Sequence, residues 1–229
     1  MSEVKLPKGG STITYSTREE VQKDLGNSDR DLLLKLYEIG EHISTLLQVR
    51  CPDITIANMI TELNEHDGSL SIMLGKHYSP ADIPELENDL ILLALPSWQL
   101  SERVIGVLAH EIRHIFQDQF DSRIKETLAQ GYRESLYNPA EIDADGFAIW
   151  YLYKFYGMHI EKAGSLLCPK EKKYEIKAYI KRIDSAKEFE AEFLKKEEEY
   201  RVSIDHENSN ILSFFKRLFK KYKSRKRNI

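Results

Sequence analysis

The sequence predicts an α+β fold in which a small sheet accompanies several helices, and three observations support this prediction. Residues 69–74 and 89–95 are short apolar runs bounded by turn-forming residues, which is typical of strands. Residues 101–119 and 139–156 have the periodicity or the end signals of helices. Residues 170–201 are rich in Lys and Glu, with apolar residues at broadly helical intervals, and indicate a helix or helical hairpin packed on the domain.

The chain before these elements contains one clear helix. Ser28 with Asp31 resembles a helix start, and the apolar residues from Leu32 to Leu47 recur at helical spacing. The pattern of residues 54–63 is mixed and fits either a strand or a helix, so both interpretations stay open. Residues 1–15 are expected to form a loose arm.

The segment His110-Glu111-Ile112-Arg113-His114 is the most informative part of the chain. It spells H-E-x-x-H, the helical zinc-binding signature of metallopeptidases. At about 100° per residue, His110 and His114 fall within about 40° of each other on the expected helix. Two unrelated structural histidines are the alternative, but both of these avoid the apolar arc of the helix. That arc consists of Val104, Ile105, Leu108, Ile112, Ile115 and Phe116.

Two further residues of this helix bear on the site. Glu111 lies next to the two imidazoles but not between them, so it can reach a metal-bound water without being a ligand. Gly106 stands one turn before His110 and is expected to keep the approach to that side open.

A catalytic zinc site needs three protein ligands and an open position, so the third ligand decides the class. A metzincin would carry Gly and His where this chain has Gln117 and Phe120, and that class is therefore excluded. The helix at 139–156 offers Glu141 and Asp145, which are spaced i, i+4 on one face.

The ends of that helix are well marked. Asn138 is a good N-cap, Pro139 a good first helical residue and Gly157 a C-terminal stop. The small residues Ala144 and Ala148 allow close packing against the helix of the signature. Since Asn138 precedes Glu141 by three positions, a capping box is the alternative role for this Glu.

The pattern Glu-x-x-Ala-Asp, from Glu141 to Asp145, on a helix that follows H-E-x-x-H resembles the gluzincin arrangement of thermolysin-like peptidases. Within residues 30–157 the chain is most similar to small cytoplasmic peptidases of bacterial genomes and mobile elements, including the ImmA/IrrE type that cleave repressors. The resemblance implies a zincin-like mini-gluzincin core, with a small sheet beside the signature helix. It also implies that Glu141 is the third zinc ligand.

The same resemblance implies that Asp145 accepts a hydrogen bond from the far nitrogen of His110. Glu126 and Glu134 are the alternative ligands, although neither has an Asp four residues later. The chain departs from the family in two respects. Arg113 replaces the Gly that usually precedes the second His, and the charged C-terminal third has no counterpart in the minimal fold.

The expected chemistry follows from one Zn²⁺ per chain, held by His110, His114 and Glu141. Zinc lowers the pKa of its bound water towards about 7, and Glu111 takes a proton from that water as it attacks a scissile carbonyl. Glu111 then passes the proton to the leaving amine. A separate donor often stabilises the oxyanion, and Tyr132, Tyr137 and His159 are candidates by location.

Composition sets the expected setting. With 229 residues, 41% of them hydrophobic, the chain can form one moderate domain with an appendage. The two cysteines, Cys51 and Cys168, form no Cys-x-x-Cys pattern, which favours reduced thiols in the cytoplasm and no disulfide partner. The N-terminus lacks an apolar signal region, and the apolar run at 90–95 is too short to span a membrane.

We expect four parts along the chain. These are an N-terminal arm (1–27), the metallopeptidase domain (28–160), a charged helical extension (161–208) and a basic amphipathic tail (209–229). Residues 211–227 contain eight Lys or Arg and no acid, so a whole-chain charge of −4 leaves −4 − 8 = −12 for the rest. Such a segment can bind an anionic membrane or a nucleic acid, or it can bind its own acidic domain or stay disordered.

The sequence thus favours a cytoplasmic zinc endopeptidase acting on a protein or peptide substrate. The alternative is a non-catalytic zinc-fold module that binds or regulates through its basic tail. The presence of Glu111 argues against this alternative, because a non-catalytic descendant has no need of a general base.

Overall fold

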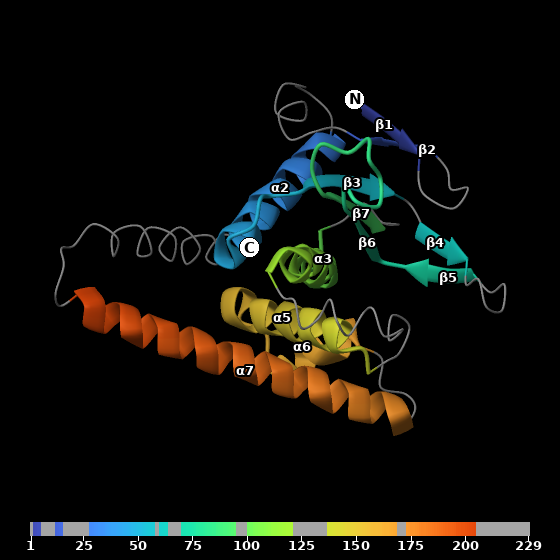
Figure 1. Cartoon of the computed structure of the whole chain (residues 1–229). Helices are drawn as coiled ribbons and strands as arrows, with labels where there is room; N and C mark the ends of the chain where they lie inside the picture. The colour runs from blue at the N-terminus through green and yellow to red at the C-terminus, as the bar shows by residue number, and fades with distance from the viewer. Residues whose placement is uncertain are drawn as a thin grey trace. The chain divides into compact units, whose positions relative to one another are not determined.

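A computed structural model of the chain describes residues 2–5, 12–15, 28–57, 60–63, 70–94, 100–120, 137–168 and 173–204. Within these residues the fold is α+β, with five helices and three small sheets (Figure 1). The chain divides into two compact units, Met1–Lys187 and Glu188–Ile229. The basic tail lies outside the described residues. No helix among the described segments is long and apolar enough to cross a membrane.

The central sheet has three strands in the order β3-β7-β6, formed by Asp53–Ala57, Leu90–Ala94 and Gly75–Tyr78 respectively. β7 pairs in parallel with β3 and antiparallel with β6. Every residue of β7 is buried, because this strand has a neighbour on each side. The prediction that the apolar run at 89–95 includes a buried core strand is therefore confirmed for Leu90–Ala94.

The helix that precedes this sheet is α2 (Ser28–Leu47), whose predicted start and end are confirmed. The Tyr37 hydroxyl accepts a hydrogen bond of 2.9 Å from the backbone N–H of Ile54, which ties α2 to β3. The segment whose pattern fitted both helix and strand forms two strands, β3 and β4 (Ile60–Leu63). Its mixed pattern arises because the two strands belong to different sheets.

Two antiparallel pairs complete the strands. β5 (Leu70–Met73) falls within the predicted strand at 69–74, but it pairs with β4 and not with β7, whose second edge is occupied by β6. In the N-terminal arm, β1 (Ser2–Lys5) pairs with β2 (Thr12–Tyr15). The expectation of a loose arm at residues 1–15 was therefore wrong for these two segments.

The signature lies on α3 (Glu102–Phe120), which packs between the central sheet and α5 (Pro139–Tyr156) (Figure 1). Four residues of the predicted apolar arc are fully or almost fully buried, namely Ile105, Leu108, Ile112 and Ile115. A helix enclosed on two sides must bury such an arc, and the imidazoles are left on the side that faces α5.

The ends of α5 follow the sequence. The Asn138 side chain accepts a hydrogen bond of 2.9 Å from the backbone N–H of Ala140, as an N-cap does. Gly157 ends the helix in the left-handed region, with a φ of 66° that favours glycine, and its N–H reaches back to the Tyr153 carbonyl. The Glu141 carboxylate, in the first turn, lies against the imidazoles of α3, with Oε2 3.3 Å from Nε2 of His110.

The far side of α5 packs against α6 (Ile160–Leu167) and against the first part of α7 (Lys173–Ile204). α7 is a single helix, not a hairpin, and its first part belongs to the unit that contains the other helices. Gly106 was expected to keep the approach to His110 open, and this expectation was wrong. A Cβ there would lie 2.7 Å from the Leu167 side chain and 3.1 Å from that of Leu152, so this glycine lets α3 approach α5 and α6.

Candidate metal centre

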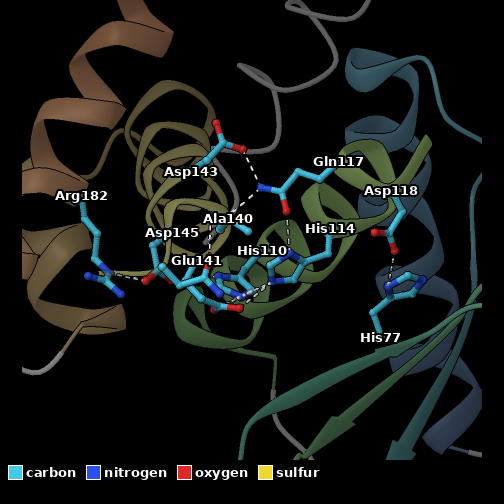
Figure 2. A network of polar contacts seen from close by, with 11 residues as sticks. His77, His110, His114, Gln117, Asp118, Ala140, Glu141, Asp143, Asp145 and Arg182 are labelled. Atoms are coloured by element: carbon cyan, nitrogen blue, oxygen red, sulfur yellow. Dashed lines mark hydrogen bonds and ion pairs between the residues drawn. The ribbon is translucent and has the colours of Figure 1, made fainter. Parts of the chain in front are cut away.

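Two helices bring three potential metal ligands together. His110 and His114 come from α3 and Glu141 from α5, and one ligand atom of each lies within 4.8 Å of the others. The two Nε2 atoms are 2.9 Å apart. Glu141 Oε2 lies 3.3 Å from Nε2 of His110, and Glu141 Oε1 lies 3.5 Å from Nε2 of His114 (Figure 2). Glu126 and Glu134, the alternative ligands, fall outside the described residues.

These separations fit a small divalent cation. Zinc bound tetrahedrally at about 2.0–2.1 Å from nitrogen and oxygen ligands would hold those atoms roughly 3.3 Å apart. The three separations found here, 2.9, 3.3 and 3.5 Å, surround that value. The Glu141 side chain is 38% exposed, so solvent can reach the cluster at this carboxylate. Two imidazoles, one carboxylate and an open side are the composition of a catalytic zinc site.

His110 is oriented by a carboxylate from α5. Its Nδ1 lies 2.8 Å from Asp145 Oδ1, while Asp145 Oδ2 accepts a hydrogen bond from Nε of Arg182 on α7 (Figure 2). The bond to Asp145 places the proton of the neutral imidazole on Nδ1, which leaves the lone pair of Nε2 for a metal. Asp145 thus lies where the gluzincin resemblance implies. The sequence offered no signal for Arg182.

The charges of the cluster shift the pKa values of its members. Burial by itself lowers the pKa of His110, but the carboxylates of Asp145 and Glu141 outweigh it and hold that pKa well above the usual range. Burial likewise opposes ionisation of Glu141 and Asp145, yet His110 holds the pKa of both carboxyls below their usual range. In the metal-free protein the His110 imidazole therefore retains an extra proton, which must leave when a cation binds.

His114 is oriented by an amide. Its Nδ1 lies 2.8 Å from Gln117 Oε1, and Gln117 Nε2 donates to the Ala140 carbonyl at 3.0 Å and to Asp143 Oδ2 at 2.7 Å (Figure 2). Because both acceptors lie on the Nε2 side of the amide, its oxygen must face the imidazole. The proton of neutral His114 therefore also sits on Nδ1, and its Nε2 faces the cluster.

Arg113 joins the same network through Asp143, which also accepts a hydrogen bond from Gln117. Its Nε and Nη2 bind the two oxygens of Asp143 at 2.7 and 3.1 Å, and its guanidinium lies 4.3 Å from the centre of the Phe116 ring. Such a two-pronged pair fixes the carboxylate in position and angle. The sequence showed Arg113 and Gln117 only as departures from known patterns. The i, i+3 spacing of His114 and Gln117 was available as a signal, but their partner Asp143 is on another helix.

Glu111 is buried against the central sheet. A Cβ at Gly75, the first residue of β6, would lie 2.8 Å from Glu111 Oε1 and 3.0 Å from its Cγ. Only glycine leaves room for the carboxylate at this point, a constraint that the sequence analysis missed. β6, like β3, is an edge strand of the central sheet, so Glu111 lies beside a strand with one strand neighbour among the described residues.

The remaining polar candidates differ in their surroundings. The Tyr137 ring lies 5.2 Å from Nζ of Lys181. The His159 side chain is 93% exposed and lies 4.0 Å from the Glu161 carboxylate, a position that does not favour it as part of a buried site. Tyr132 falls outside the described residues. The role of an oxyanion stabiliser therefore stays a prediction for Tyr132 and Tyr137.

Cys168 is a buried thiol close to Asp145. Burial raises the pKa of this thiol above the usual range, and the Asp145 carboxylate raises it further. The thiol is therefore protonated in the metal-free protein. Neither Cys168 nor Cys51 forms a disulfide.

The geometry of the cluster stands without support from relatives. No protein-family model matches this chain, and neither a curated protein nor a solved structure is significantly similar to it.

Proposed function

We propose that this chain is a zinc-dependent metallopeptidase with a zincin-like core of the gluzincin type, which hydrolyses peptide bonds of an intracellular protein. The observation that supports it most is the convergence of His110, His114 and Glu141 within 4.8 Å, next to the buried Glu111. These three residues would hold the metal. When bound, zinc supplies Lewis acidity and lowers the pKa of a coordinated water towards about 7.

Glu111 is the general base of the proposed reaction. It accepts a proton from the water that attacks the scissile carbonyl and returns it to the amine as the C–N bond breaks. One water is thereby added across the peptide bond, which yields a carboxylic acid and an amine. Two features support this role: Glu111 directly follows the ligand His110 on α3, and its buried side chain is held by the close approach of Gly75.

The edge strand β6 supports a peptide as the substrate. Strand edges offer backbone N–H and C=O groups to an extended chain, which can add to the sheet as a further strand. Among the described residues β6 pairs only with β7, and its first residue touches the general base. A peptide paired with the outer edge of β6 would therefore run past Glu111 with its backbone extended.

The ligand assignment is tested by metal analysis of the purified chain. We expect one zinc per native chain and a loss of at least about 100-fold in affinity in His110→Ala, His114→Ala and Glu141→Ala, since each removes one of three ligands. The exposed His159 provides the matched control, because His159→Ala removes an imidazole outside the cluster. Native zinc content in all three ligand variants would contradict the proposal.

The role of Glu111 is tested separately with Glu111→Gln. This variant should keep its zinc and lose at least about 100-fold in peptide cleavage, because the amide cannot accept the proton. Glu102→Gln removes an exposed carboxylate from the same helix and should cleave normally. The substrate can be found by comparing new protein termini in cells that express the native chain and Glu111→Gln. Undiminished cleavage by Glu111→Gln would refute the mechanism.

A further inference from the structure

Arg182, on the charged helix α7, contacts the residue that orients His110 in the proposed metal centre. The Arg182 side chain is only 8% exposed, and its Nε donates to Asp145 Oδ2 (Figure 2). Its Nη1 donates to the Ala178 carbonyl at 3.2 Å, one turn earlier on the same helix. These two hydrogen bonds, from Nε and from Nη1, fix the orientation of the guanidinium. The other oxygen of Asp145 holds Nδ1 of His110.

The position of Arg182 is set by close helix packing. A Cβ at Gly146, the residue after Asp145, would lie 2.2 Å from Ser185 Oγ and 3.3 Å from the backbone nitrogen of Ala186. A Cβ at Gly164 on α6 would lie 2.6 Å from Cδ1 of Ile183. Two glycines thus let α7 approach α5 and α6 at the level of Asp145. Arg182 can reach the carboxylate only because the backbones come this close.

The electrostatics explain why a cation is needed there. Asp145 is partly buried, and Glu141 contributes a second carboxylate on the other side of His110. A buried carboxylate is stable in its ionised form only when it is paired and hydrogen-bonded. Without Arg182, Oδ2 of Asp145 would lose this donor, and the carboxylate would be free to turn away from His110. Such a rotation would loosen the imidazole that the proposed metal requires.

We propose that Arg182 is a positioning residue of the metal centre, which holds the Asp145 carboxylate in place so that His110 presents Nε2 to the metal. This inference rests on the proposed zinc site. It makes the first part of α7 a component of the centre, although the sequence indicated only a charged helix packed on the domain. The competing explanation is that Arg182 merely anchors α7 and affects zinc no more than any packing residue would.

The two explanations differ in a double-mutant cycle on zinc affinity. The Kd for zinc is measured by competition with a chelator in the full-length native chain, Arg182→Gln, Asp145→Asn and the double variant. We expect Arg182→Gln and Asp145→Asn each to raise the Kd about tenfold or more. The double variant should match Asp145→Asn within about twofold, because Arg182 acts only through Asp145. Lys177→Gln removes an exposed charge from the same helix and should leave the Kd unchanged.

Two results would overturn the inference. The first is a Kd for zinc in Arg182→Gln that lies within about twofold of the native value. The second is that Arg182→Gln raises the Kd of Asp145→Asn by the same factor as it raises the Kd of the native chain, which means that the two residues act independently. If Arg182→Gln alone does not fold, Arg182→Met takes its place in the cycle, because it keeps a long side chain for packing but donates no hydrogen bond to Asp145. A native chain that binds no zinc through His110 would instead refute the proposed function itself.

Discussion

His110 and His114 present the same nitrogen to the centre, but their other nitrogens rest on different kinds of partner. Both Nδ1 atoms have an oxygen acceptor at 2.8 Å. For His110 the acceptor is a carboxylate paired with an arginine from α7, whereas for His114 it is an amide on its own helix. The geometry of the two imidazoles is therefore equivalent, but the charge behind them is not. A carboxylate orients the ring and raises its basicity, while an amide only orients it.

The contrast also separates local from distant support. Gln117 is three residues from His114, so α3 supplies this partner through its own periodicity. Asp145 is 35 residues from His110 and Arg182 is 37 residues beyond Asp145, so three helices must dock before the His110 side is complete. We therefore expect the His110 side to respond more strongly to changes in the packing of α5 and α7.

The largest expected difference between the two sides is in zinc affinity. Asp145→Asn should raise the Kd for zinc about 10- to 100-fold, because it removes the charge behind His110. Gln117→Leu should raise it only roughly fivefold, because the orienting bond is lost but no charge is. Competition with a chelator measures both values, and unfolding of the metal-free variants shows whether each fold is intact. A greater loss in Gln117→Leu than in Asp145→Asn would invert the comparison.

A partly buried histidine outside the centre extends the comparison to pH. His42 on α2 lies 2.7 Å from the Tyr151 hydroxyl and packs edge-on against Phe155. Burial lowers its pKa from 6.5 to about 4, the opposite direction to His110. Since the unfolded chain then binds a proton more readily than the folded one, this contribution is present above pH 6.5 and is lost as the pH falls towards 4.

The size of this effect is on the order of 2 kcal/mol in the free energy of unfolding between pH 7 and pH 4. It is measured by denaturant unfolding of the metal-free native chain and His42→Gln at both pH values. The variant keeps a polar side chain but cannot titrate, so the advantage of the native chain over it should shrink at low pH. A constant difference between the two proteins across this range would show that His42 is not held neutral.

The smallest expected effect comes from a residue that serves neither imidazole. Gly75→Ala would place a Cβ against the Glu111 carboxylate and displace it. We expect kcat/KM for peptide cleavage to fall roughly tenfold while the Kd for zinc stays within about twofold, because a small misplacement of a catalytic group slows the reaction. Gly106→Ala is the matched control, since its Cβ would meet the Leu167 and Leu152 side chains and not Glu111. It should lower stability but not the activity of the folded protein, and normal cleavage by Gly75→Ala would show that Glu111 tolerates displacement.

The sequence by itself determined what depends on one stretch of chain. The helix with His110 and His114 on one side follows from 3.6 residues per turn, and the ends of α5 follow from the capping chemistry of Asn138 and Gly157. The buried run in β7 could likewise be recognised from its apolar residues. Each of these features needs only neighbours within a few positions.

The tertiary structure alone decided which distant groups meet. Gly106 and Gly146 carry no side chain that a pattern could interpret, yet they set how closely α6 and α7 approach the helices of the site. The approach of α7 places Arg182 against Asp145, and the separate approach of β6 to α3 places Gly75 against Glu111. The sequence also left the partner of β5 undecided. In the structure β5 pairs with β4, and β6 pairs with β7. Helix periodicity fixes directions within one element, whereas contacts between elements depend on packing that no single segment contains.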